Sequence, residues 1–124
     1  MKSIIGTVEL NGTSFHYEMA GIGPPVVMVH AGIADSRMWE GQFAPLSKWF
    51  KMIRYDMRGY GRTPPAEVQF SHRDDLAALL GHLGIARASF VGCSLGSKTA
   101  FDFALDYPEQ VERLVLTSPS VSGF

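Results

Sequence analysis

The sequence predicts an α/β fold that opens with an antiparallel hairpin and continues as parallel strands with helices on both faces of the sheet. Two observations support this prediction. Asn11 and Gly12 separate two strand-like segments, and this dipeptide readily takes the two positive φ angles of a type I′ turn. Further along, the apolar run of residues 26–29 has no polar alternation, which is typical of a strand buried on both faces of a parallel sheet.

After the hairpin, strand-like and helix-like segments alternate, as a covered parallel sheet requires. Pro45 is a candidate break in the first helix, because proline has no N–H to donate. Ser71 and Asp74 have the spacing of a capping box, and Gly84 stands where a helix carboxyl end favours glycine. Strands are expected over residues 3–10, 13–20, 26–29, 51–55, 88–92 and 111–117, and helices over 37–49, 71–83 and 95–107.

Composition and charge narrow the class of protein. The 124 residues carry 11 basic and 12 acidic side chains, so there is no electrostatic footprint for nucleic acid or anionic lipid. The single cysteine, Cys93, cannot form an internal disulfide or a zinc cluster. Neither a secretory signal nor an apolar run of about 18 residues is evident. We therefore expect a cytoplasmic globular protein without a nucleic-acid or membrane partner and without a cofactor or metal.

The segment Gly92-Cys93-Ser94-Leu95-Gly96 joins an expected strand to an expected helix. A serine at the apex of such a turn is lifted clear of the sheet, and small residues two positions before and after it let neighbouring backbone approach. The amino end of the following helix favours negative charge at the same place. Ser94 is therefore the candidate nucleophile, and the Leu95 N–H is a candidate donor to the oxyanion of an acyl-transfer reaction.

Two further motifs stand upstream, each after an expected strand. His30-Ala31-Gly32 follows residues 26–29, and the block that runs from Asp56 to Thr63 follows residues 51–55. With the Ser94 turn, they resemble three motifs of the α/β-hydrolase superfamily, in the order of that family. The resemblance implies that Gly32 supplies a second oxyanion N–H and that His30 braces its loop. Ala31 stands where the family usually has glycine, so the backbone there must avoid strongly positive φ or accept strain.

The resemblance covers essentially the whole chain and is greatest to the serine esterase, enol-lactonase and non-haem peroxidase-like branch. It implies acyl transfer on Ser94 with an ester, lactone or similar small molecule as substrate. Serine at this turn argues against the dehalogenase and epoxide-hydrolase relatives, which need a carboxylate there. Asp56 and Arg58 are expected to form an ion pair that organises their loop. His16, His72 and His82 are expected at the surface.

The remaining members of a catalytic triad are not evident. In this family the acid and histidine follow the serine, but no histidine follows Ser94. Residues 1–124 are therefore expected to form the amino-terminal part of the fold, strands one to six, without the acid, the base or a lid. A role of His30 as surrogate base stays open.

Two functional interpretations remain for this chain. One is a serine hydrolase whose base and acid come from another chain or from a longer protein. The other is an inactive half-domain that self-associates or complements another chain. Cofactor-free C–C or peroxide chemistry on the same serine is a lesser possibility. In each case the segment from Val111 to Thr117 is expected to be an open sheet edge, which would be covered in a homo-oligomer or by a complementing chain.

Overall fold

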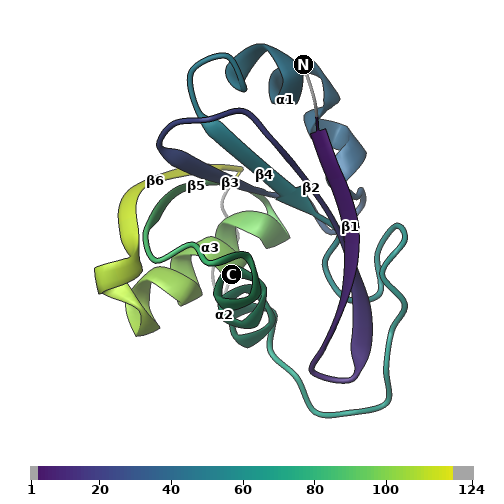
Figure 1. Cartoon of the computed structure of the whole chain (residues 1–124). Helices are drawn as coiled ribbons and strands as arrows, with labels where there is room; N and C mark the ends of the chain where they lie inside the picture. Colours follow the sequence, from purple (N-terminus) through teal and green to yellow (C-terminus); the bar gives the residue numbers. More distant parts are fainter. Residues whose placement is uncertain (1–2, 119–124) are drawn as a thin grey trace.

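The computed structural model describes residues 3–118, which form one six-stranded sheet and three α-helices (Figure 1). The strand order across the sheet is β1-β2-β4-β3-β5-β6. The strands are β1 (Ser3–Leu10), β2 (Thr13–Ala20), β3 (Pro25–Val29), β4 (Lys51–Tyr55), β5 (Ala88–Cys93) and β6 (Val111–Thr117). The α-helices are α1 (Glu40–Leu46), α2 (His72–Leu83) and α3 (Leu95–Asp106), and the short 3-10 helices are η1 (Ser36–Trp39) and η2 (Pro108–Gln110).

The hairpin is antiparallel and the rest of the sheet is parallel, as the sequence predicts. Asn11 has φ 50° and Gly12 has φ 89°, the two positive angles expected of the turn. Strand β2 pairs antiparallel with β4, whereas β3 pairs parallel with both β4 and β5, and β5 with β6. Ser3 lies opposite Ala20, which in turn pairs with Met52 near the start of β4. The α/β fold class is thereby confirmed.

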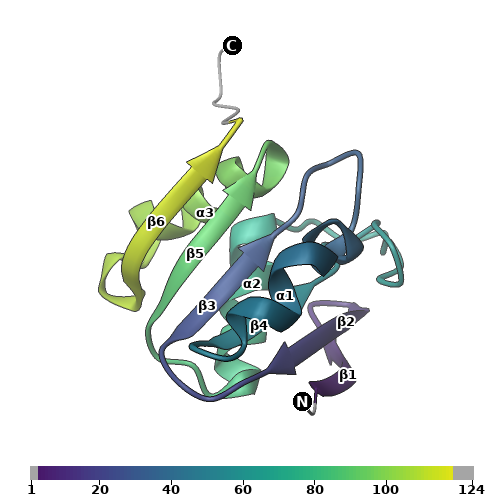
Figure 2. The same cartoon turned by 90° about the horizontal axis from the view of Figure 1, so that it is seen from above.

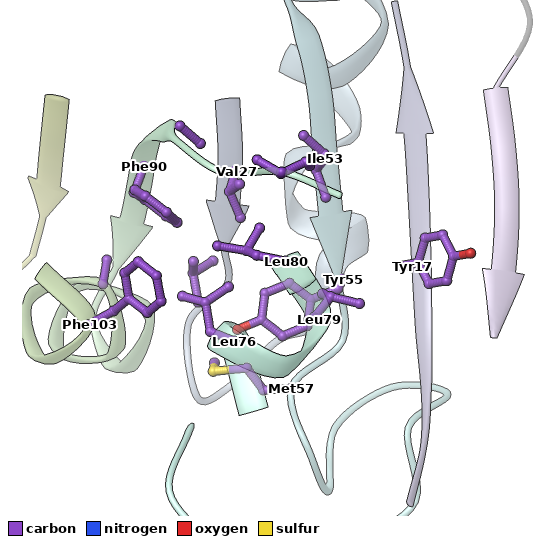
Figure 3. Packing of buried hydrophobic residues seen from close by; sticks show 14 of the residues in the cluster. Tyr17, Val27, Ile53, Tyr55, Met57, Leu76, Leu79, Leu80, Phe90 and Phe103 are labelled. Carbon is purple, nitrogen blue, oxygen red and sulfur yellow. The ribbon is translucent and has the colours of Figure 1, made fainter. Parts of the chain in front are cut away.

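Helices cover the two faces of the sheet unequally (Figure 2). On one face α2 and α3 pack against the parallel strands. Figure 3 shows Leu76, Leu79 and Leu80 of α2 beneath the strand residues, with Phe103 of α3 facing Phe90 of β5. On the other face, η1 and α1 cover β3 and β4 through Trp39, Phe43, Met28 and Met52. The parallel strands are therefore buried on both faces only where α1 reaches them.

Strand β6 is an edge of the sheet, as predicted, and the face that α1 leaves bare extends to it. Across that face, exposure rises from 2% for Met28 of β3 to 51% for Val115 of β6. A groove of about 670 Å³ lies there, lined by side chains such as Leu46, Phe50, Val91 and Val115. No helix within residues 3–118 is long and apolar enough to cross a bilayer.

The first helix differs from the prediction of a single helix over residues 37–49. It begins as η1, where the Asp35 carboxylate accepts a hydrogen bond from the Arg37 N–H, and α1 ends at Leu46. Pro45 lies in the last turn of α1, which ends one residue later, close to the predicted break. The N–H groups of Trp49 and Phe50 then both donate to the Leu46 carbonyl, and the chain turns towards β4.

The other helices agree closely with the prediction. The Ser71 hydroxyl accepts a hydrogen bond from the Asp74 N–H at 3.1 Å and so caps the amino end of α2. Gly84 takes the left-handed conformation with φ 71° at the carboxyl end of α2. Helix α3 starts at Leu95, immediately after the predicted nucleophile.

Candidate active site

Ser94 lies at the sharp turn between β5 and α3. Its backbone angles are φ 56° and ψ −114°, a conformation that side-chain-bearing residues rarely adopt. Its N–H donates to the carbonyl of Thr117 at 3.1 Å, which continues the β5–β6 ladder up to the turn. Such a strained residue persists only where the surroundings hold it, and it is typical of functional sites.

The two glycines that flank Ser94 are needed for close backbone approach. A Cβ atom added to Gly92 would lie 2.5 Å from the carbonyl oxygen of Gly96. A Cβ atom added to Gly96 would lie 2.0 Å from the carbonyl oxygen of Val29 and 2.6 Å from that of His30. The first turn of α3 therefore rests directly on the exit of β3, which brings the Ser94 turn next to the loop after β3.

That loop contains Gly32, the second predicted oxyanion donor. Strands β3 and β5 are parallel neighbours, with Val29 opposite Gly92, so their carboxyl ends meet at one edge of the sheet (Figure 2). A Cβ atom added to Gly32 would lie 3.3 Å from the Leu95 Cβ atom. The two loops that carry the predicted donors are thus in contact. Within residues 3–118, Ala31 does not have a positive φ, so of the two alternatives its backbone avoids the strain.

His30 is fully buried and both of its ring nitrogens are occupied. Its Nε2 atom accepts a hydrogen bond from the Met57 N–H at 2.9 Å, so the proton lies on Nδ1, which donates to the Ala31 carbonyl at 2.8 Å. Burial lowers the pKa of His30, which keeps the ring neutral. This geometry ties the loop after β4 to the loop after β3 and leaves no ring nitrogen to accept a proton from Ser94.

Asp56 and Arg58 organise backbone and loops, but the predicted ion pair between them is wrong. The Asp56 carboxylate accepts hydrogen bonds from the N–H groups of Ser36 at 2.7 Å and Arg62 at 3.0 Å. Arg58 instead pairs with Asp75 of α2 at 3.0 Å, and both side chains are almost completely buried. Each group therefore has a separate partner, and the long loop is attached both to η1 and to α2.

The other histidines differ in exposure. His82 is exposed, as predicted, but His16 is only 8% exposed, because its strand is covered by the loop that contains Thr63 and Arg62. His72 is half-buried at the start of α2, and burial lowers its pKa. Its Nδ1 atom is buried and has no hydrogen-bond partner within residues 3–118.

Two residues that were not predicted as site residues lie beside the predicted ones. The Thr117 carbonyl accepts from the Ser94 N–H and from the Ser97 hydroxyl, while the Thr117 hydroxyl donates to the Gly92 carbonyl at 2.9 Å. Tyr60 packs edge-on against the His30 ring, with the ring centroids 5.3 Å apart. Tyr60 belongs to the motif from Asp56 to Thr63 and so could have been noticed, whereas no local sequence signal marks Thr117.

One cavity reaches Leu95, but none of Ser94, Gly32 and Tyr60 lines it. Its volume is about 300 Å³, and it extends between the start of α2 and the first turns of α3, along His72, Lys98 and Thr99. Within the described part of the chain, no three His, Cys, Asp or Glu side chains are grouped so that they could hold a metal ion. Cys93 is half-buried and packs against the cluster beneath α1.

Comparison with known proteins assigns the family. The family model described as "alpha/beta hydrolase fold" matches residues 24–123. The chain belongs to the α/β-hydrolase family. A putative carbamate hydrolase, RutD, from Caulobacter vibrioides is 32% identical over 125 residues, which cover 94% of this chain and 45% of that protein. A soluble epoxide hydrolase from Corynebacterium is 33% identical over 110 residues, which cover 86% of this chain and 38% of that one.

Solved α/β-hydrolase structures agree with this assignment. The structure of Est816, described as an N-acyl homoserine lactone degrading enzyme, matches with a TM-score of 0.87 and 32% identity, covering 92% of this chain and 45% of that one. The chain spans between 31% and 45% of the length of the curated relatives it matches. Hydrolases of several substrate classes thus share the described sheet and helices, and the chain corresponds to less than half of these relatives.

Proposed function

We propose that this chain carries the nucleophile part of a serine hydrolase that acts on an ester, lactone or similar acyl substrate. The observation that supports this most is the backbone of Ser94, held at φ 56° between β5 and α3 by backbone contacts that only glycines at 92 and 96 permit. No packing requirement of an ordinary strand-to-helix connection calls for a strained serine. A serine hydroxyl carried on a turn of this kind would be available for nucleophilic attack.

In the proposed reaction, the Ser94 Oγ atom attacks the carbonyl carbon of the substrate and its proton passes to a general base. The N–H groups of Gly32 and Leu95 stabilise the negative charge that develops on the carbonyl oxygen. The amino end of α3 adds the positive end of its dipole at the same place. The tetrahedral intermediate collapses to an acyl-serine and the leaving alcohol takes up a proton. Water then releases the acyl group as a carboxylic acid.

Within residues 3–118, the candidate surrogate base and three of the acidic residues after Ser94 already have other partners. Both ring nitrogens of His30 already have partners. The acidic residues after Ser94 that lie in ion pairs are bound at the surface: Asp102 to Lys98, Asp106 to Arg73 and Glu112 to Arg87. We therefore infer that the base and acid are supplied by another chain or by a longer protein, and that the 124-residue chain alone has weak activity at most.

Serine at position 94 favours acyl transfer over epoxide opening, although an epoxide hydrolase is among the relatives. Opening an epoxide through a covalent intermediate needs a carboxylate, which forms an ester that water can then hydrolyse. A serine would form an ether, which water does not hydrolyse under these conditions. Cofactor-free C–C or peroxide chemistry would use the same serine. Screening substrates of these classes beside esters would distinguish it from ester hydrolysis.

The proposal is tested by hydrolysis of p-nitrophenyl acetate. We expect the wild-type chain to release nitrophenolate faster than Ser94→Ala, with a mass increase of one acetyl group on the wild type only. Ser3→Ala is the matched control, because it removes a hydroxyl from the exposed start of β1, away from the Ser94 turn. Equal rates for the wild type and Ser94→Ala would show that Ser94 is not a working nucleophile in this chain.

A second candidate function is that of a half-domain that associates through β6. It is favoured by the open edge of β6 and by the groove next to Val115, because an unpaired edge beside exposed apolar side chains readily pairs with another strand. The occupant we propose is a second copy of the chain. Sedimentation at low micromolar concentration should then give a dimer or larger assembly that Val115→Lys weakens, and a stable monomer would contradict it.

A further inference from the structure

Tyr60 has a hydroxyl group without a partner, and it lies at the candidate oxyanion site. Within residues 3–118, its Oη atom makes no hydrogen bond. The same atom lies 3.5 Å from the position that a Cβ atom on Gly32 would occupy. The Leu95 side chain lies 3.3 Å from that position. The hydroxyl is therefore grouped with the two residues whose N–H groups are the proposed oxyanion donors.

The position of Tyr60 is fixed by the structure around it. Its N–H donates to the Met57 carbonyl and its carbonyl accepts from the Thr63 N–H, both at 2.9 Å, so the backbone forms a tight turn. The ring packs edge-on against His30, and the centroid of the His72 ring lies 6.4 Å from that of Tyr60. His30 is itself held by the two hydrogen bonds described above. The phenol is thus oriented by its surroundings before any substrate binds.

We propose that the Tyr60 hydroxyl is a further substrate-contacting group, which donates a hydrogen bond to the acyl oxygen held by Gly32 and Leu95. A phenol O–H can donate a hydrogen bond to a carbonyl oxygen. A donor placed where negative charge develops stabilises the transition state more than the bound ester. The role presupposes acyl transfer at Ser94, to which it adds a third donor and thereby a preference for carbonyl substrates.

Tyr60→Phe tests this role, because it removes one oxygen atom and keeps the ring that packs on His30. We expect the rate constant for acylation by p-nitrophenyl acetate to fall roughly tenfold, the usual effect of one charge-assisted hydrogen bond. The KM should change little, since the bond strengthens in the transition state. Tyr107→Phe is the matched control: that ring stacks on Phe103 at the far end of α3, and its loss of a hydroxyl should leave the rate unchanged.

The possible results separate this inference from the proposed function. If Ser94→Ala abolishes acylation but Tyr60→Phe acylates as fast as the wild type, only the role of Tyr60 is overturned. If the wild type and Ser94→Ala react equally, both are overturned. The melting temperature of Tyr60→Phe should equal that of the wild type, because the hydroxyl has no protein partner. A fall in melting temperature that accompanied the slower reaction would make the hydroxyl structural and would also overturn the inference.

Discussion

Replacing Gly96 by alanine should lower the free energy of unfolding by about 3 kcal/mol or more. The added Cβ atom would lie 2.0 Å from the carbonyl oxygen of Val29, which is more than 1 Å short of an ordinary contact. It would also lie 2.6 Å from the His30 carbonyl oxygen. Both contacts are with backbone at the buried carboxyl end of β3, so no side chain can rotate away. The first turn of α3 would have to move off β3.

Gly81→Ala is the matched control, because it makes the same chemical change in a helix without steric conflict. Gly81 lies in α2, is exposed, and has no atom within 4 Å of an added Cβ. Alanine should raise the free energy of unfolding there by about 0.5–1 kcal/mol, since glycine loses more backbone entropy in a helix. The two substitutions are therefore expected to have opposite signs.

Urea unfolding followed by circular dichroism measures both changes. For a domain of this size, a loss of about 3 kcal/mol in the free energy of unfolding corresponds to a fall in melting temperature on the order of 10 °C. The Gly96→Ala chain should also react more slowly at Ser94, because the turn is displaced. A Gly96→Ala chain as stable as the wild type would refute the inference that α3 rests directly on the backbone of β3.

Three further results are expected from the same unfolding measurements. Ser94→Gly should raise the free energy of unfolding by about 1 kcal/mol, because glycine accepts φ 56° without strain, and Ser94→Ala should not. Asp75→Asn should lower the free energy of unfolding by about 3–5 kcal/mol, because it leaves the buried charge of Arg58 unpaired. Asp102→Asn is the control, because its pair with Lys98 is partly exposed and should contribute little. An equal effect of the two substitutions would contradict this reasoning. Burial lowers the pKa of His30 in the folded chain below the ordinary histidine value of 6.5. As the pH falls below 6.5, His30 is therefore protonated in the unfolded chain before it is protonated in the folded chain. Stability should then decline and level off below the pKa of the folded state, and His30→Gln should have a shallower decline than the wild type.

Features set by residues close together in the sequence could be predicted. The turn at Asn11 and Gly12, the cap of α2 by Ser71 and the carboxyl end of α2 at Gly84 each depend on a few neighbouring residues. The same is true of the turn at Ser94, where a short pattern of small residues between a strand and a helix fixes the geometry. The order of the elements followed from these signals.

Features set by packing between distant segments could not be predicted. The Arg58 partner, Asp75, lies 17 residues away on α2, and the carbonyl of Thr117 reaches the Ser94 turn from another strand. The first helix was predicted too long because the apolar pattern continues to Trp49, yet that side chain is 69% exposed. Similarly, nothing in the hairpin sequence indicates that the long loop covers His16.

The direction of β1 decides how the molecule can be attached to a surface. Ser3 lies opposite Ala20, beside the beginning of β4, so β1 starts at the sheet edge where the parallel strands begin. The turn at Ser94 and the Gly32 loop lie at the other edge. A solid support or a fused carrier protein joined through the start of β1 would therefore lie at the end of the sheet opposite the Ser94 turn. Acylating probes and candidate complementing chains could then reach Ser94 from the solution side.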